Sequence, residues 1–518
     1  MPAMASPRAR AAIDWLSLLP EARVVAGEPG AVTGVCFDSR RVVPGALFVA
    51  VVGLDTDGHR YLREALDRGA TALLVQEDRR ELWAPFLGKD AAAVAVADTR
   101  SALAKAAAGF SGRPATKLGV VGVTGTDGKT TTVHLIAHVL EAGGRPAGYL
   151  SSAAFRASGA PARNASHMTT LEAPFVQEQL AAMVEAGMRY AVIEASSHGL
   201  ALHRVDECAF DVAVFTTLSR DHLDFHGTMD EYREAKGRLF RMLDEAAAKE
   251  GVAKAAVVNA DDPASGYFRS LSRAPLTTYG LDAPADVRAE AIEAQGLAMR
   301  FRLVTAAGSA DVAVRLAGRY NVSNCLAAAA VALSQGVTVE EIARGLASFP
   351  GVPAHLELID CGQPFRVVVD IASTPDAMRR VLEVLRPITE GRLWAVFGAA
   401  GERDPARRDG IGRVAGELAD FAVLTNEDPR REDPDAIIEQ IVAGLREAGR
   451  EEGRDFARVP DRRAALRYAF ERASASGGGD TVLLAGKGTE PSIEMATEAI
   501  PWDEAQAARE VLLELDGS

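Results

Sequence analysis

Short apolar runs alternate with longer stretches of helical spacing along most of this chain. Up to about residue 112, β-like runs at 32–37, 46–52, 70–75 and 92–97 are separated by helical stretches. Further runs follow at 190–193, 212–216 and 255–259, and then at 365–370, 393–397, 421–425 and 481–485. Strands that alternate with helices predict an α/β protein with mainly parallel sheets, in which ligands bind at the carboxyl ends of the strands.

Two stretches rich in Gly, Pro and Ser divide this pattern into three blocks. Ser-Gly-Arg-Pro-Ala at 111–115 ends the first block, and Ser-Phe-Pro-Gly-Val-Pro at 348–353 ends the second. A chain of 518 residues is long enough for about three domains. We therefore expect domains at 1–112, 113–348 and 349–518.

Composition and charge exclude several classes of protein. Hydrophobic residues make up 48% and charged residues 25%, as in globular proteins. The net charge of −14 disfavours nucleic acid and anionic membranes as partners. The four cysteines are scattered, which argues against a disulfide framework or zinc site and suits a reducing cytosol: Cys36, Cys208, Cys325 and Cys361. No run reaches the ~20 apolar residues of a membrane span, and the N-terminus lacks an export signal, so we expect a cytoplasmic protein.

The sequence Gly-Val-Thr-Gly-Thr-Asp-Gly-Lys-Thr-Thr-Thr at 122–132 carries the strongest chemical signal. It joins an apolar run to a stretch of helical spacing that begins at Val133. A Gly-rich turn there points backbone N–H groups at a phosphate, and the helix N-terminus and Lys129 add positive charge. The hydroxyl of Thr130 is placed to bind Mg²⁺. The sequence thus predicts a nucleotide site, although Val123 stands where the strict P-loop spacing has Gly.

Acidic residues and histidines follow two later strands. Glu194 ends the run 190–193; taken alone, such an acid is more often a solvated loop residue than an Mg²⁺ ligand. His222 and His226, with two aspartates beside them, crowd the end of the run 212–216, which is typical of a metal or phosphate site, with a charged loop as the alternative. Lys236 lies in a helical stretch, where a lysine is ordinarily solvated.

Taken together, these segments resemble the Mur ligases, a family of ATP-dependent amide ligases. GVTGTDGKTTT, EASSHGL, LSRDHLDFHGTMDEY and REAKGRLF occur in the family's order and spacing, and similar motifs extend over nearly the whole chain. The resemblance implies a uridine-binding N-terminal domain, a central P-loop ATPase domain with a mainly parallel sheet, and a Rossmann-like C-terminal domain. Folylpolyglutamate synthase, a related ligase, is disfavoured because its family lacks such a uridine-binding domain.

The resemblance also implies a reaction. ATP phosphorylates the terminal carboxylate of UDP-N-acetylmuramoyl-L-Ala-D-Glu, and the amine of a third amino acid attacks the acyl phosphate, yielding a peptidoglycan precursor. Arg430 offers a bidentate fork for a distal carboxylate, so meso-diaminopimelate is the leading amino acid. Lysine or ornithine are alternatives, as are a divergent Mur-ligase paralogue with another substrate and a non-catalytic nucleotide-binding protein.

The family's functional residues can be carried over to matching positions. The catalytic set is Lys129, Glu194, His222 and Lys236, with Mg²⁺ held by Thr130, Glu194 and His222. Lys236 aligns with a lysine that the family carbamylates to N6-carboxylysine, an anion that tolerates Mg²⁺ beside it. The positions that match ATP-binding residues are Gly125, Thr126, Asp127, Gly128, Lys129, Thr130, Thr131, Asn321, Asn324 and Asp370.

Two further groups match substrate-binding positions. The UDP-muramoyl-dipeptide group comprises Phe37, Ser39, Leu54, Asp55, Thr56, Thr169, Thr170, Ser196 and Arg204. The amino-acid group comprises Arg403, Glu427, Asp428, Pro429, Arg430, Gly486 and Glu490. Asp428 stands where the family usually has Asn, and its extra negative charge would favour a substrate ammonium.

Several positions depart from the family pattern. His355 replaces an arginine, and Ser373 and Thr489 each replace a histidine. On the substrate side, Leu202 replaces a glutamine and Met168 an asparagine. The phosphate loop, the expected Mg²⁺ ligands and Lys236 are all present, so we expect activity, with altered ATP contacts in the last domain.

Overall fold

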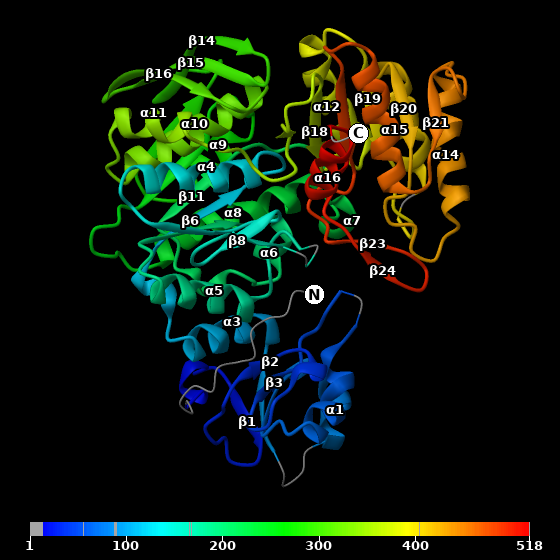
Figure 1. Ribbon diagram of the computed structural model, residues 1–518. Coiled ribbons are helices and arrows are strands. Elements are labelled where there is room, and N and C mark those ends of the chain that lie inside the picture. Colours follow the sequence, from blue (N-terminus) through cyan, green and yellow to red (C-terminus); the bar gives the residue numbers. More distant parts are fainter. Residues whose placement is uncertain are drawn as a thin grey trace. The chain divides into compact units, whose positions relative to one another are not determined.

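The computed structural model describes residues 14–54, 56–86, 91–164, 166, 168–403 and 405–516 (Figure 1). Asp55, predicted to bind the uridine substrate, lies outside the described residues. The chain divides into two compact units: the first runs to residue 291 and includes 301–312 and 320–349, and the second comprises the rest. Among the described residues, no helix has the length and apolar character needed to cross a membrane.

The first unit opens with a five-stranded sheet in the order β1-β5-β4-β3-β2. Only β1 runs antiparallel to its neighbour; the other strand pairs are parallel. Its strands are β1 (Arg23–Ala26), β2 (Val35–Cys36), β3 (Leu47–Val49), β4 (Ala72–Gln76) and β5 (Ala92–Val96), and its helices are α1 (Leu62–Asp67), α2 (Arg80–Trp83) and α3 (Thr99–Phe110). Apolar clusters cover both faces of the sheet, since successive side chains on a strand point in opposite directions.

An eleven-stranded sheet follows, in the order β16-β15-β14-β13-β12-β11-β6-β10-β7-β8-β9. Its strands are β6 (Gly119–Thr124), β7 (Ala147–Leu150), β8 (Ala154–Arg156), β9 (Ala162–Arg163), β10 (Tyr190–Glu194), β11 (Val212–Phe215), β12 (Ala255–Asn259), β13 (Leu276–Gly280), β14 (Val287–Gln295), β15 (Ala298–Thr305) and β16 (Gly308–Val314). Its helices are α4 (Lys129–Ala142), α5 (Ala173–Glu185), α6 (Ser197–Ala201), α7 (Leu223–His226), α8 (Met229–Glu245), α9 (Ser265–Arg269), α10 (Arg319–Ser334) and α11 (Val339–Ala347).

The middle of this sheet is parallel and buried. Strand β6 pairs in parallel with β10 and β11, so that the ends of all three strands lie at one edge. Val120, Ile193 and Phe215 belong to one apolar cluster with side chains of α5 and α8. A strand buried between helices must be apolar throughout, which explains why these runs were readable in the sequence.

The second unit holds a six-stranded sheet in the order β17-β18-β22-β19-β20-β21, parallel except for β17. Its strands are β17 (Glu357–Ile359), β18 (Arg366–Asp370), β19 (Leu393–Phe397), β20 (Phe421–Leu424), β21 (Phe456–Arg458) and β22 (Thr481–Ala485), and an antiparallel pair follows, β23 (Ser492–Glu494) with β24 (Ala499–Pro501). One apolar cluster joins the sheet to α12 (Pro375–Leu385), α13 (Ala406–Leu418) and α14 (Pro434–Glu447), and another joins it to α15 (Arg462–Ala475) and α16 (Glu504–Asp516).

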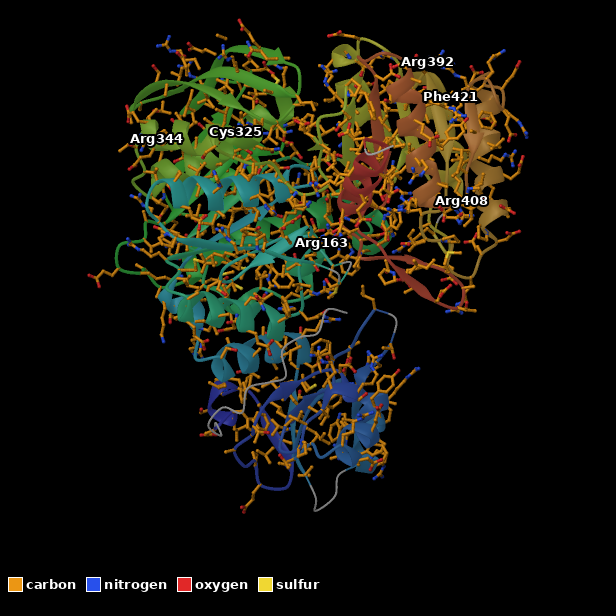
Figure 2. All side chains as sticks on the ribbon, in the orientation of Figure 1. Arg163, Cys325, Arg344, Arg392, Arg408 and Phe421 are labelled. Carbon is orange, nitrogen blue, oxygen red and sulfur yellow. The ribbon has the colours of Figure 1, made fainter. Side chains whose placement is uncertain are left out.

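The expected class, α/β with mainly parallel sheets, is confirmed. Every apolar run predicted as a strand contains one, although the run 32–37 keeps only the two residues of β2. All four cysteines are thiols outside any disulfide, and burial raises the pKa of Cys325, which Figure 2 labels on α10.

Candidate active site

The phosphate loop joins β6 to α4, as predicted. Gly125 and Gly128 have φ of +152° and +81°, in the region that favours glycine. A Cβ on Gly125 would lie 1.9 Å from the hydroxyl of Thr216, and one on Gly128 would lie 2.5 Å from the side-chain oxygen of Asn324. Both glycines are therefore required by the close packing of the loop against β11 and α10.

Hydrogen bonds to backbone carbonyls fix the conformation of the loop. Thr216, just after β11, donates its hydroxyl to the carbonyl of Asp127 at 2.6 Å, and Thr126 N–H donates to the carbonyl of Thr217 at 2.7 Å. Lys129 donates from Nζ to the carbonyl of Thr126 at 2.8 Å, so its charge lies over the loop. Thr131, which is also predicted to bind ATP, is 9% exposed in the first turn of α4.

A hydroxyl and a carboxylate meet beside the loop. Thr130 Oγ1 lies 3.1 and 3.2 Å from the two carboxylate oxygens of Glu194, which is 2% exposed at the end of β10. Ser152 completes this group, with its hydroxyl 2.9 Å from Thr130 Oγ1 and its N–H donating to Glu194 at 2.8 Å. Hard oxygen donors of this kind suit Mg²⁺. Ser152 was not predicted, because it follows a different strand and no local motif marks it.

Lys236 is buried rather than solvated. It is 1% exposed on α8 and donates from Nζ to the carbonyl of Gly125 at 2.6 Å. The Nζ also lies 4.2 Å from the ring centroid of Tyr232, whose hydroxyl is 3.2 Å from that of Thr126. Burial holds the pKa of Lys236 well below its usual value, and the charge of Lys129 lowers it further. The amine of Lys236 is thus buried beneath the phosphate loop, in a setting that disfavours its charged form.

His222 lies in a separate cluster of aromatic rings. It has a φ of +52° just before α7, and its ring is 4.8 Å from that of His198. His198 stacks on Phe225 at 4.2 Å, and burial together with the neighbouring histidines lowers its pKa to about 4. Within the described residues, no three His, Cys, Asp or Glu side chains group as a metal site. A role for His222 as an Mg²⁺ ligand therefore stays a prediction.

Asn321 and Asn324 reach the phosphate loop from α10. Asn324 donates to the side chain of Asn321 at 3.0 Å and accepts from the Thr132 hydroxyl at 3.2 Å. Both amides are buried behind Gly128. They support the loop in this structure, and direct contact with ATP stays a prediction.

The residues expected to hold the muramoyl-dipeptide form a network on the other side of Glu194. Thr170 donates to the carbonyl of Glu194 at 2.7 Å, and its hydroxyl lies 3.0 Å from that of Ser196. Arg204 donates to the carbonyl of Thr170 at 3.0 Å and pairs with Glu172 at 2.7 Å. Thr169 beside them is half-buried. Glu172 was missed by the sequence reasoning.

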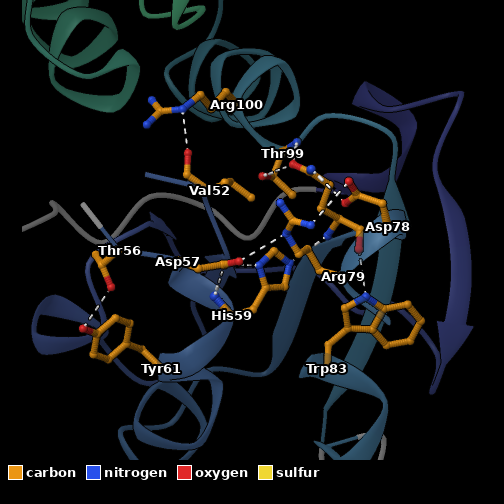
Figure 3. Close-up of polar contacts among 11 residues, drawn as sticks. Val52, Thr56, Asp57, His59, Tyr61, Asp78, Arg79, Trp83, Thr99 and Arg100 are labelled. Atoms are coloured by element: carbon orange, nitrogen blue, oxygen red, sulfur yellow. Dashed lines mark hydrogen bonds and ion pairs between the residues drawn. The ribbon is translucent and has the colours of Figure 1, made fainter. Parts of the chain in front are cut away.

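The remaining predicted uridine-side residues lie near β2 and β3. Phe37 packs on the N-terminal core, Ser39 donates its hydroxyl to Glu64 at 2.9 Å, and Leu54 is 62% exposed. The hydroxyl of Thr56 lies 3.3 Å from that of Tyr61 (Figure 3). An exposed apolar side chain beside a hydroxyl is compatible with a nucleoside ligand.

A buried histidine fixes the base of this loop. His59 Nδ1 lies 2.6 Å from Asp57, and its Nε2 accepts the N–H of Gln76 at 2.9 Å (Figure 3). The two ring nitrogens of His59 are thus both engaged, one with a side chain and one with the backbone. The residue that precedes Asp57, Thr56, is thereby held at the rim of the N-terminal sheet.

In the second unit, three loops converge at the carboxyl ends of β19, β20 and β22. A Cβ on Gly398 would lie 2.2 Å from the carbonyl of Thr425, and one on Gly486 would lie 2.6 Å from Oε2 of Glu427. Arg408, labelled in Figure 2, is buried, pairs with Glu432 and donates to the carbonyl of Ala400. The two glycines thus allow the predicted amino-acid loops to pack closely, and Arg408 stabilises that packing.

The charged residues of these loops form one buried cluster. Lys487 is fully buried and donates to Asp428 and to Glu490, each at 2.7 Å. Asp428 is therefore paired inside the protein in this structure, and its expected role toward a substrate ammonium stays a prediction. Burial raises the pKa of Glu427 to about 7, against the opposing effect of Arg462.

The two predicted arginines differ in setting. Arg430 is half-buried, has a φ of +53°, and donates its N–H to the carbonyl of Glu494 at 2.8 Å, next to the buried Pro429. Within the described part of the chain its guanidinium makes no ion pair, which leaves it available to a ligand carboxylate. Arg403 is exposed.

Of the positions that depart from the family pattern, His355 and Ser373 lie near Asp370 in space or in sequence. Its carboxylate accepts the N–H groups of Leu356 and Ala372 at 2.8 and 2.9 Å, and burial raises its pKa while His355 opposes that shift. Ser373 is exposed, whereas Thr489 is 6% exposed. In this structure Asp370 stabilises the turn after β18, and contact with a ribose stays a prediction.

Comparison with known proteins decides the family. Residues 31–111 match the Mur ligase family catalytic domain, residues 123–332 the Mur ligase middle domain, and residues 356–488 the Mur ligase glutamate ligase domain. The chain belongs to the Mur ligase family. It is accordingly an ATP-dependent ligase, as the resemblance of its motifs implied.

Individual Mur ligases are similar over nearly the full length. A UDP-N-acetylmuramyl-tripeptide synthetase of Roseiflexus sp. (strain RS-1) is 47% identical, covering 93% of this chain and 95% of the relative. A UDP-N-acetylmuramoyl-L-alanyl-D-glutamate–2,6-diaminopimelate ligase of Geobacillus kaustophilus (strain HTA426) is 40% identical, covering 97% and 99%. A solved structure of a ligase with that second name is 29% identical, with a TM-score of 0.67 over 98% of this chain and all of that one.

Proposed function

We propose that this protein joins a third amino acid, meso-diaminopimelate, to UDP-N-acetylmuramoyl-L-Ala-D-Glu in the cytoplasm, with ATP as the energy source. The observation that carries the proposal is the similarity over 93% of the chain to a tripeptide synthetase. The meeting of Thr130, Ser152 and Glu194 beside the phosphate loop supports it. These oxygens fit Mg²⁺, which when bound neutralises phosphate charge during transfer.

The chain's own residues suggest how the reaction proceeds. The loop amides and Lys129 would hold the β- and γ-phosphates, since they combine a helix N-terminus with a full charge. Arg204 and Ser196 would hold the dipeptide so that its terminal carboxylate attacks the γ-phosphorus and ADP leaves. The amine of the incoming amino acid then displaces phosphate from the acyl phosphate. Most of the rate enhancement would come from positioning and charge neutralisation.

Lys236 would act as a carbamate. Its neutral amine can add to CO₂ with loss of one proton, which gives an anionic side chain at a site that holds the cation poorly. The carbamate nitrogen keeps one hydrogen, so it can still donate to the carbonyl of Gly125. The fit rests on burial and lowered basicity, the two conditions that favour such a modification.

The identity of the amino acid rests on Arg430. Of the two arginines in the predicted amino-acid group, Arg430 is half-buried and Arg403 is exposed, and Arg430 lies two residues after Asp428, the partner of Lys487. Diaminopimelate carries the distal carboxylate that such a fork would bind, whereas lysine and ornithine do not. Glu427 and Glu490 would face the substrate's amino groups.

Substrate-dependent ATP turnover tests the proposal. The purified protein should release ADP only when Mg²⁺, UDP-N-acetylmuramoyl-L-Ala-D-Glu and the amino acid are all present, and mass spectrometry should find the tripeptide product. Lys129→Ala should slow turnover by about a hundredfold or more, because it removes the one full charge over the loop. Lys117→Ala, at an exposed lysine just before β6, is the control and should be unaffected. No turnover with any diamino acid would refute the proposal and favour a paralogue of other function.

A further inference from the structure

A buried ion pair joins the first residues of two helices in the second unit. Arg462 begins α15 and Glu504 begins α16, and both side chains are fully buried. Arg462 donates from Nε and Nη2 to the two carboxylate oxygens of Glu504, at 2.8 and 2.7 Å. Trp502 donates its indole N–H to the same carboxylate. The guanidinium is therefore fixed in one orientation.

The remaining donors of Arg462 reach two strand ends. Nη1 donates to the carbonyl of Asn426 at 3.1 Å, and Nη2 donates to the carbonyl of Ala485 at 3.0 Å. Asn426 follows β20 and Ala485 ends β22. The next residues, Glu427 and Gly486, begin two of the three loops predicted to bind the amino acid. The guanidinium of Arg462 thus connects the residues just before both loops.

The spacing of these loops matters because their contact is tight. Glu427 is 5% exposed, and its Oε2 has no hydrogen-bond partner among the residues that the structure describes. That oxygen would lie 2.6 Å from a Cβ at position 486, so the two loops touch at the glycine. The next residue in each loop, Asp428 and Lys487, form their buried ion pair. A change of a few tenths of an ångström between the strand ends would move every charged group of the cluster.

Stability alone gives little reason for an arginine here. Taking both charges out of water offsets most of their attraction, and well-packed apolar residues of similar volume commonly stabilise a fold as well as a buried ion pair does. An apolar pair would not bond to the carbonyls of Asn426 and Ala485. The feature that only Arg462 supplies is a planar fork that satisfies Glu504 and both strand ends at once.

We propose that Arg462, oriented by Glu504, is a positioning residue that sets the affinity for the incoming amino acid without touching it. The proposal rests on the function proposed above, because it takes the loops at 426–430 and 486–490 as the amino-acid site. It predicts that only one of the three substrates, the amino acid, is bound more weakly when Arg462 is replaced. Loss of the fork should raise the KM for the amino acid and leave the KM values for ATP and the UDP-linked substrate unchanged.

The test compares two double variants that each remove one ion pair between α15 and α16. Arg462→Met with Glu504→Met removes the buried pair without leaving an unpaired charge. Arg463→Met with Glu510→Met is the matched control, because this neighbouring pair joins the same helices at 2.8 Å but is exposed. For each variant the thermal midpoint, the kcat and the three KM values are measured.

We expect the buried-pair variant to raise the amino-acid KM by about tenfold or more, with the other two KM values within about twofold of wild type. The control variant should keep all three KM values within about twofold of wild type. The proposal would be overturned if the KM for the amino acid were unchanged, or if all three KM values rose equally. If the double variant does not fold, Arg462→Lys, which keeps a charge for Glu504 but loses the fork, is judged by the same KM values. A wild type without turnover would instead refute the proposed function.

Discussion

At the scale of single residues, burial decides which side chains are unusual. Lys236 and Lys487 are both fully buried, but only Lys487 has two carboxylate partners. Lys236 donates to one backbone carbonyl, and its pKa falls because burial disfavours its charged form more than the nearby carboxylates favour it. The same residue type therefore has two carboxylate partners in one unit and only a backbone carbonyl and an aromatic ring beside it in the other.

Lys236→Ala should reduce turnover by about a hundredfold or more, because the anionic carbamate would be lost from a closed electrostatic site. Acetate or formate added at millimolar concentration should restore part of the activity, since either fits the space left by the side chain. Initial rates with and without the added carboxylate measure this rescue. Lys236→Arg is the control, which keeps a cation, fills the space and should not be rescued. A crystal structure of the active enzyme with an unmodified Lys236 would contradict the carbamate.

Arg430→Ala should selectively weaken the use of diaminopimelate. A charge-assisted bond to its distal carboxylate is worth about 1.5–3 kcal/mol, so kcat/KM for diaminopimelate should fall about tenfold to a hundredfold. Any activity with lysine should be nearly unchanged, because lysine lacks that carboxylate. Arg431→Ala, at the neighbouring residue, is the control: that side chain is 84% exposed. A wild-type preference for lysine or ornithine would show that Arg430 lacks this role.

At the scale of secondary-structure elements, most strands buried on both faces were predictable, with β7 as an exception, and the exposed strands β14 to β16 were not. Strands β12, β19 and β22 have the predicted bounds, because each is an uninterrupted apolar run between helices. Strands β14 to β16 were missed, since charged residues interrupt them. Their signal was present as alternation: Met299, Phe301 and Leu303 are buried, while Arg300 and Arg302 between them are exposed.

The same distinction applies to the site. The phosphate loop could be predicted because its glycines, Lys129 and Thr130 are neighbours in sequence. Glu194 was assigned only through the family resemblance, although it ends an adjacent parallel strand. The roles of Ser152 and Arg462 could not be predicted, because their hydrogen-bond partners belong to elements that are far away in the sequence. The pairing of Asp428 with Lys487 also needed the structure, because 59 residues separate them.

At the scale of the whole molecule, the first unit joins its two sheets through charged side chains near the predicted dipeptide site. Arg100 on α3 donates to the carbonyl of Val52 at 2.9 Å and lies 3.8 Å from Glu172, the residue before α5. Glu172 also pairs with Arg204 at 2.7 Å. One carboxylate therefore lies between an arginine of the N-terminal sheet region and an arginine expected to bind the UDP-linked substrate.

Glu172→Gln should raise the KM for UDP-N-acetylmuramoyl-L-Ala-D-Glu by about tenfold, equivalent to about 1.4 kcal/mol, with little change in the KM for ATP. Glutamine retains the shape but loses the charge, so Arg100 and Arg204 repel each other and Arg204 loses the partner that orients it. Steady-state kinetics with each substrate varied in turn measure the effect.

Glu207→Gln provides the comparison for this last effect, because Glu207 pairs at 3.2 Å with Arg113, which is 51% exposed, just after α3. Exposed pairs contribute about 0–1 kcal/mol, so this variant should stay close to wild type. Added salt should weaken substrate binding by similar factors in the wild type and in the Glu207 variant. Equal KM values in both variants and the wild type would show that Glu172 serves only to pack the two sheets together. If the KM for the UDP-linked substrate rises only in Glu172→Gln, the carboxylate of Glu172 contributes to dipeptide binding. Because this carboxylate connects Arg204 to Arg100, an arginine near the N-terminal sheet would then also influence that binding.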